Sequence, residues 1–294
     1  MNKFTIKDLE NLSGIKAHTI RIWEQRYSFL KPQRTATNIR YYSNLELKVL
    51  LNISLLNKYG YKISHINRMT NEELREKTLT LTSPEAQQER TINDLIQHMT
   101  DVDIDQFEAV IDQHIHAKGI EKTITYIIFP FLERIGILWL TDHINPAQEH
   151  LITNIIRQKL IVGIDKAITP LSLKTKMLLF LPENEHHEIG LLFLHYLLKN
   201  RGVKVIYLGA NVPVKDLEYV VELKKPHYIY THLTTVIKEF NFDKFINNLK
   251  LRFPQQQIII SGLMAQTFEK KQVPANFRFL KSFAEVNEFL SSLP

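Results

Sequence analysis

The carboxyl-terminal part of the chain, residues 175–294, alternates short apolar segments with amphipathic ones, and this alternation constrains the fold more than any other feature. The predicted strands are KMLLFLP (176–182), KVIYLG (204–209), HYIYTHL (227–233), IIIS (258–261) and FRFL (277–280). The predicted helices are residues 191–199, 214–223, 242–249 and 283–290. Strands separated by helices imply a doubly wound, parallel α/β sheet of the Rossmann-like kind, whose ligands bind at the carboxyl ends of the strands.

Three other regions precede this sheet. Residues 1–75 are basic and carry short helical patterns. Residues 76–90 are polar without a clear apolar period and are predicted to be a linker or a frayed helix end. Residues 91–170 are helical throughout. Within the last region, residues 120–140 are apolar on most faces, so we expect them at the centre of a helical bundle, with a kink or break at Pro130. The predicted fold is therefore multidomain.

Composition places the chain among globular proteins of a reducing compartment. Hydrophobic residues make up 44% and charged residues 23% of the sequence, and there is no cysteine. Disulfides, thiolate metal sites and cysteine nucleophiles are thereby excluded. No apolar run is long enough to span a membrane, and MNKFTIKDLE lacks the apolar core of a signal peptide. We expect a cytoplasmic protein without membrane partners.

Positive charge is concentrated at the amino-terminal end. Between Met1 and Thr70, seven Lys and five Arg stand against one Asp and three Glu, a formal charge of +8, whereas the whole chain carries +6. This distribution favours a polyanion such as nucleic acid as the partner, and a solvated basic surface is the alternative.

The same segment has the pattern of a winged helix-turn-helix. Thr5 can cap a first helix, Ser13-Gly14 ends it, and residues 18–26 form a second helix able to enter a DNA major groove. The segment LKPQRTATNIRYYS then predicts a basic hairpin with its tip at residues 34–38, which would grip phosphates as a wing.

From Thr5 onward the segment resembles the DNA-binding domain of the MerR family over nearly its whole length. The shared elements are T-I-R-x-W-E-x-R-Y, the L-K-P that leads into the wing and the R-Y-Y that leaves it, whereas Lys16 stands where a Ser or Asp helix cap is expected. The resemblance implies binding to a double-stranded DNA operator. The candidate DNA contacts are Thr19, Arg21, Arg26, Arg34, Arg40 and Tyr42. Ordinary surface charge and wing packing are the alternative explanation of these residues.

The first predicted strand of the sheet is followed by ENEHHEIG, which contains E-x-H-x-x-G as Glu185, His187 and Gly190. A histidine at a strand end can ligate a metal through one nitrogen, and a carboxylate two residues earlier can fix its tautomer through the other. The glycine allows close approach at a helix start. One histidine is a poor zinc site, but it suits a metal held in a macrocycle with one axial position open.

This loop resembles the signature of cobalamin-binding Rossmann-like domains. The later S-x-L and G-G motifs of that family correspond to Thr231-His232-Leu233 and Ser261-Gly262, and all but His232 are candidate cofactor contacts. The resemblance implies that Ser261 adds a side chain where the nucleotide tail of cobalamin would thread.

The order of the domains resembles the CarH/LitR family of cobalamin-dependent, MerR-type regulators. The resemblance implies that His187 ligates cobalt and that Glu185 orients it. In the helical bundle, W-x9-E-H places Trp139, Glu149 and His150 around the upper, adenosyl group of adenosylcobalamin. It also implies a repressor, a homo-oligomer (dimer or tetramer) and a light-labile cobalt–carbon bond.

Light sensing requires a second histidine after Trp139 in that family, and this chain has Leu140 there. His143 is a conceivable substitute. Two other functions stay open: a MerR-type regulator that has lost cobalamin and responds to a protein partner, which Leu140 and Ser261 favour, and a corrinoid methyl-carrier protein, which the basic amino-terminal domain disfavours.

Overall fold

A computed structural model describes residues 2–140, 144–169, 172–234, 240–268 and 273–294, without the side chains of Ile137, Trp139 and Leu140. The chain divides into two compact units, Met1–Ile155 and Ile156–Pro294. Helix α10 (Pro146–Lys166) contributes to both units. Among the described residues, no helix combines the length and the apolar character needed to cross a membrane.

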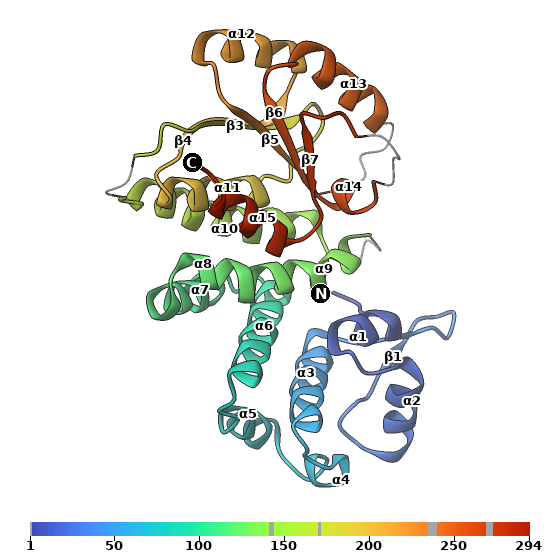
Figure 1. Cartoon of the computed structure of the whole chain (residues 1–294). Coiled ribbons are helices and arrows are strands. Elements are labelled where there is room, and N and C mark those ends of the chain that lie inside the picture. The colour runs from blue at the N-terminus through green and yellow to red at the C-terminus, as the bar shows by residue number, and fades with distance from the viewer. Residues whose placement is uncertain (1, 141–143, 170–171, 235–239, 269–272) are drawn as a thin grey trace. The chain divides into compact units, whose positions relative to one another are not determined.

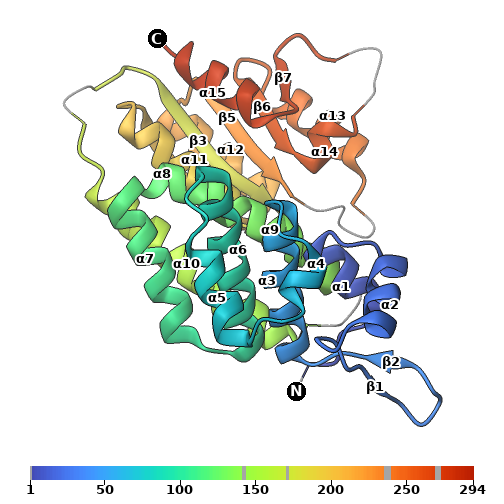
Figure 2. The same cartoon turned by 90° about the horizontal axis from the view of Figure 1, so that it is seen from below.

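The amino-terminal part of the first unit is a winged helix-turn-helix, as predicted. Its elements are α1 (Ile6–Ser13), α2 (Ala17–Arg26), β1 (Gln33–Arg34), β2 (Arg40–Tyr41), α3 (Asn44–Lys58) and α4 (Ile63–Ile66). Thr5 and Ser43 cap α1 and α3, each in a reciprocal capping box, whereas Lys16 makes no side-chain cap at α2. The antiparallel β1–β2 hairpin projects away from the helices (Figure 2).

The prediction of a linker at residues 76–90 is wrong, because most of this segment is helical. Helix α5 (Asn71–Leu79) and helix α6 (Pro84–Asp101) leave only residues 80–83 between them. The polar composition concealed two helix starts: Thr70 caps α5 in a capping box, and Ser83 caps α6 with Pro84 in its first turn.

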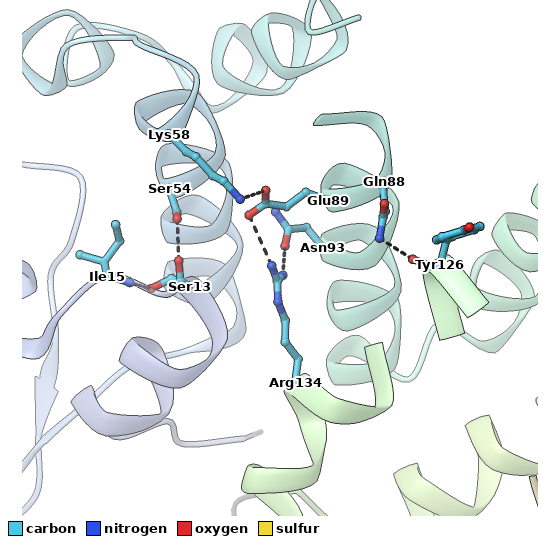
Figure 3. Close-up of polar contacts among 9 residues, drawn as sticks. All are labelled: Ser13, Ile15, Ser54, Lys58, Gln88, Glu89, Asn93, Tyr126 and Arg134. Carbon is cyan, nitrogen blue, oxygen red and sulfur yellow. Dashed lines mark hydrogen bonds and ion pairs between the residues drawn. The ribbon is translucent and has the colours of Figure 1, made fainter. Parts of the chain in front are cut away.

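The bundle continues with α7 (Ile104–Lys118), α8 (Ile120–Thr123), the π-helical turn η1 (Ile124–Ile128) and α9 (Phe129–Leu140). Pro130 has no N–H to donate to the carbonyl of Tyr126, and the side-chain amide of Gln88 on α6 donates to that oxygen instead, at 2.7 Å (Figure 3). The predicted irregularity at Pro130 therefore takes the form of a π-helical turn whose open carbonyl is satisfied from a neighbouring helix.

Polar contacts tie the DNA-binding part of the first unit to its bundle part. Glu89 on α6 accepts from Lys58 on α3 at 2.6 Å and from Arg134 on α9 at 3.4 Å, and Arg134 also donates to Asn93 at 2.7 Å (Figure 3). The helix after the wing and the core of the bundle thus share one carboxylate.

The second unit is a five-stranded parallel sheet with the order β4-β3-β5-β6-β7, as the alternation predicted. The strands are β3 (Lys176–Pro182), β4 (Lys204–Val212), β5 (Tyr228–Leu233), β6 (Gln257–Gly262) and β7 (Phe277–Leu280). The helices are α11 (Ile189–Asn200), α12 (Val214–Lys224), α13 (Phe242–Arg252), α14 (Leu263–Gln266) and α15 (Phe283–Ser291). Helices α12 and α13 cover one face of the sheet, and α11 and α15 cover the other (Figure 1). The strand order reverses between β3 and β5, where sheets of this kind bind ligands at the strands' carboxyl ends.

Candidate functional site

Helix α2 turns Ile20 and Trp23 into the core and its arginines toward solvent. Ile20 and Trp23 are buried, whereas Arg21 and Arg26 are exposed and Thr19 is half-buried. An exposed guanidinium can pair with a phosphate or with the edge of a guanine. The arginines of α2 are therefore accessible to a partner, and their contact with DNA stays a prediction.

The wing organises its own arginines. The guanidinium of Arg34 donates to the backbone carbonyl of Asn38 at 3.2 Å and to its side-chain oxygen at 2.8 Å. Asn38 has a positive φ of 64° at the tip of the hairpin. Arg40, on the returning strand, lies 3.3 Å from the carboxylate of Glu24 on α2. Arg34 therefore shapes the tip, and Arg40 joins the wing to α2.

The burial of Tyr42 contradicts the prediction that this residue contacts DNA. Its side chain is fully buried, and its hydroxyl donates to Glu24. Burial, and then the bond to Glu24, raise the pKa of Tyr42 above its ordinary value, so the hydroxyl keeps its proton and acts as a donor. The residue packs beneath the wing because its backbone pairs with Phe4 and turns the ring inward. Tyr42 holds the carboxylate that in turn holds Arg40.

In the second unit, the loop after β3 brings together two predicted residues. Glu185 is fully buried, and its Oε1 accepts from the backbone N–H of His187 at 2.9 Å and lies 2.6 Å from His187 Nδ1. Half of the His187 side chain is exposed, at 50%. A carboxylate at Nδ1 places the proton on that nitrogen, which makes Nε2 the atom that can ligate a metal.

The end of β4 braces this loop. The backbone N–H of Asn211 donates to the carbonyl of Glu185 at 3.1 Å, and the Asn211 side chain accepts from the N–H of Asn184 at 3.0 Å. Asn184 and Asn211 both have positive φ, at 67° and 58°. The loop that carries His187 is thus held in a defined shape by the neighbouring strand.

A half-buried polar cluster lies next to His187 along the chain. Glu188 accepts from Arg157 on α10 at 2.7 Å and from the hydroxyl of Tyr207 on β4 at 2.6 Å. The ring of His195 stacks on Tyr207 at 5.1 Å, and burial lowers the pKa of His195 to about 4. The cluster fastens the second half of α10 to the start of α11 and to the sheet.

Gly190, the third residue of the motif, lies directly against His232. A Cβ atom at Gly190 would come within 2.5 Å of the His232 ring. Nδ1 of His232 lies 2.7 Å from Oγ of Ser261, its partner in the register of β5 and β6. Burial lowers the pKa of His232 to about 4, so the ring is neutral at neutral pH. A neutral imidazole therefore fills the space between the start of α11 and the ends of two strands.

The structure does not bring Thr231 and Leu233, two candidate cofactor contacts, to the side of β5 that faces Gly190. Successive side chains of a strand point to opposite faces. Leu233 is buried in the core formed with α12 and α13, and Thr231, which points to the same side, is buried with no hydrogen-bond partner for its hydroxyl among the described residues. The residue between them, His232, faces α11. The period of two could have identified it from the sequence, but a comparison by motif names only the outer residues.

The backbone conformation and the packing of two strands require a glycine at position 262. Its φ is +91°, and a Cβ atom there would lie 2.3 Å from the carbonyl oxygen of Leu233. The glycine therefore permits the close approach of β5 and β6, whereas the preceding Ser261 is accommodated with its hydroxyl against His232.

The predicted upper-ligand residues belong to the first unit. Trp139 lies on α9, but its side chain is outside the described part of the chain, as is all of His143. Glu149 is half-buried and His150 is exposed in the first turns of α10. The structure therefore gives the helix positions of these residues but not a shared arrangement of their side chains.

Two family models match the helical regions that precede the sheet. Residues 4–73 match the family model described as MerR HTH family regulatory protein, and residues 91–162 match the model described as B12 binding domain. The chain joins a MerR-type DNA-binding domain to a B12-binding domain. The two matched segments coincide with the winged helix-turn-helix and with most of the helical bundle.

Two curated relatives align with this chain over most of its length. The HTH-type transcriptional repressor CarA of Myxococcus xanthus is 26% identical over 98% of this chain and 95% of its own length. The HTH-type transcriptional repressor CarH of the same organism is 25% identical over 86% of each chain. The fold is also similar to that of the Methanosarcina barkeri monomethylamine corrinoid protein, with a TM-score of 0.52 and 10% identity over 69% of this chain and 99% of that one.

Proposed function

We propose that this chain is a transcriptional regulator, and not an enzyme, whose DNA binding is controlled by cobalamin. In this proposal, residues 1–75 bind a double-stranded operator, residues 91–170 cover the upper ligand of the cobalt, and residues 175–294 bind its lower side. The combination of a MerR-type domain with a B12-binding domain supports it, as does the similarity to two transcriptional repressors.

The observation that carries the proposal is the Glu185–His187 pair. A fully buried carboxylate would be costly unless it were hydrogen-bonded, and Glu185 accepts from both the backbone and the ring of His187. This arrangement orients the imidazole so that Nε2, the nitrogen turned away from the Glu185 contact, would be the one to ligate a metal, and a braced loop limits its movement. His187 is therefore suited to be a lower axial ligand. Cobalamin would supply a cobalt ion already bound by four ring nitrogens.

For the upper ligand, we propose adenosylcobalamin, with Trp139, Glu149 and His150 as its contacts. The support is the W-x9-E-H spacing within the segment that matches the B12-binding domain. Repression and a ligand-dependent homo-oligomer follow from the same resemblance. Leu140 cannot ligate cobalt, so a light response of this chain would have to use another residue, of which His143 is the nearest histidine in the sequence.

A route to the DNA-binding domain exists within the first unit. The carbonyl of Thr100, at the end of α6, accepts from Asn2 at 3.3 Å and from Asn44 at 2.9 Å, both in the DNA-binding part. The same carbonyl accepts from Gln148 at 3.3 Å, next to Glu149. A ligand that shifts the start of α10 would therefore act on the same oxygen that anchors the segment before α1 and the first residue of α3. We propose that Gln148 transmits the ligand state in this way.

The test is the absorption spectrum of the full chain mixed in the dark with adenosylcobalamin, followed on a size-exclusion column. The proposal predicts that the corrinoid elutes with the protein and that its spectrum shows replacement of the lower base by histidine. His187→Ala should abolish that change. His186→Ala, which alters the exposed neighbouring histidine, is the matched control and should preserve it.

The second candidate is a MerR-type regulator that has lost cobalamin and binds a protein partner. His232 and Ser261 favour it, because they occupy the space beside Gly190. Intact DNA binding without any co-elution of corrinoid would support this candidate and contradict the first. A third reading, a methyl-carrier protein, predicts corrinoid binding without binding to DNA.

A further inference from the structure

The space beneath the candidate cobalt ligand is closed by side chains of this chain. Three positions border it: Gly190 at the start of α11, His232 at the end of β5 and Ser261 at the end of β6. The ring of His232 lies so close to Gly190 that not even a methyl group would fit between them. No room is left there for a second aromatic ring.

A cobalamin whose cobalt is ligated by His187 must place its displaced nucleotide base below the ring. The base is a bicyclic aromatic group on a flexible tether, and it needs a slot on the same side as His187. Gly190 and His187 belong to one loop and helix start, so the slot beside Gly190 is the adjacent one. We infer that His232, held by Ser261, closes this slot, so that the chain prefers corrinoids that lack the lower nucleotide.

The hydrogen bond between His232 and Ser261 holds the ring in the slot. His232 is neutral and hydrogen-bonded, and Ser261 is 1% exposed with its hydroxyl directed at the ring. Turning the ring out of the slot would break its hydrogen bond to the buried Ser261 hydroxyl, which disfavours the open state. The inference rests on the proposed function, because it concerns which corrinoid the His187 site accepts.

The experiment compares adenosylcobalamin with adenosylcobinamide, which has the same corrin ring and upper ligand but no lower nucleotide. Dissociation constants are measured by absorption titration of the full chain in the dark. The wild-type chain should bind adenosylcobinamide at least about tenfold more tightly. His232→Ala should tighten adenosylcobalamin binding by about tenfold or more and leave adenosylcobinamide nearly unchanged, which removes the preference.

Two further variants test whether the effect of His232→Ala comes from opening the slot. Ser261→Gly removes the hydroxyl that holds the ring and should shift the preference in the same direction by a smaller factor, even if His232→Ala fails to fold. His227→Ala alters an exposed histidine immediately before β5 and should leave the preference as in the wild type.

The outcomes separate this inference from the proposed function. Equal binding of both corrinoids by the wild type, with histidine-ligated spectra and no effect of His232→Ala or Ser261→Gly, would overturn the slot closure and leave the function standing. Absence of binding by either corrinoid in all variants would overturn the proposed function and the inference with it. A preference for adenosylcobinamide that both variants erase supports both.

Discussion

The two candidate binding regions of this chain hold their polar groups in opposite ways. On the DNA-binding part, Arg21, Arg26 and Arg34 are exposed. In the α/β unit, Glu185 is fully buried, and His232 is fixed against Ser261. Binding a polyanion needs mobile cations at a surface, whereas binding a macrocyclic metal needs one ligand held in one orientation.

This difference determines what substitutions should do. An exposed arginine interacts with its partner only in the complex, so its removal should weaken binding and leave the fold intact. A buried group belongs to the fold as well as to the site, so its removal should change both. The following predictions test that contrast, from the largest expected effect to the smallest.

Substitutions of His187 and Glu185 should show the largest effect. His187→Ala should eliminate the histidine-ligated corrinoid spectrum, and Glu185→Gln should weaken corrinoid binding about 10- to 100-fold by loosening the orientation of the ring. Absorption titration measures both. Unchanged affinity in Glu185→Gln would mean that the buried carboxylate serves the fold alone.

The exposed arginines of α2 come next. Arg21→Ala and Arg26→Ala should each cost about 1–3 kcal/mol of DNA-binding free energy if they contact bases, or flatten the salt dependence by about one unit if they contact phosphates. Fluorescence anisotropy with a selected operator fragment measures both effects. Arg75→Ala, an exposed arginine on α5, is the control. Altered thermal stability of the α2 variants would break the contrast between surface and buried groups.

Loss of the Gln148 contact should change the coupling between corrinoid binding and DNA binding more than it changes the affinity for either ligand. Gln148→Ala should reduce the ligand-dependent change in DNA affinity, a coupling of about 1–3 kcal/mol in comparable systems, and leave corrinoid binding by His187 in place. DNA titrations with and without adenosylcobalamin measure the coupling. A coupling as large as in the wild type would exclude the Thr100 carbonyl as the route.

Histidines with lowered pKa values should make the stability of the α/β unit fall in acid. The pKa of His195 is lowered to about 4 in the folded chain, below its ordinary value of 6.5. Between these values the unfolded chain binds more protons, so stability falls as the pH decreases from about 6.5 to 4. Urea denaturation of His195→Phe should show a shallower dependence. Parallel curves for the two proteins would contradict this.

The smallest effect is expected at Tyr42. Tyr42→Phe should lower the free energy of unfolding by about 1 kcal/mol, because Glu24 loses a donor, and should leave the salt dependence of DNA binding unchanged. Denaturation and anisotropy measure the two quantities. A reduced salt slope would restore Tyr42 as a phosphate contact.

The amino-acid sequence predicted the elements of the fold well because their signals are local. Capping boxes at Thr5 and Ser43, and the alternation of strands with helices, mark their own positions. The linker at residues 76–90 was wrong because its polar residues lie on helices whose starts were overlooked.

The site was harder to predict because it depends on faces and on distant contacts. Glu185 and His187 are two residues apart, so their pairing was predicted from spacing. The contact of His232 with Gly190 joins positions far apart in the chain and depends on which side of β5 each residue faces. Tyr42 was misjudged for the same reason, since only the bridge to Phe4 shows that its ring points inward.

The most direct test of the central claim is the operator affinity of the wild type and of His187→Ala, each with and without adenosylcobalamin in the dark. If ligation at His187 controls DNA binding, the corrinoid should raise the affinity of the wild type by about 5- to 150-fold and leave that of His187→Ala unchanged. An equal increase in both proteins, or none in the wild type, would contradict the account.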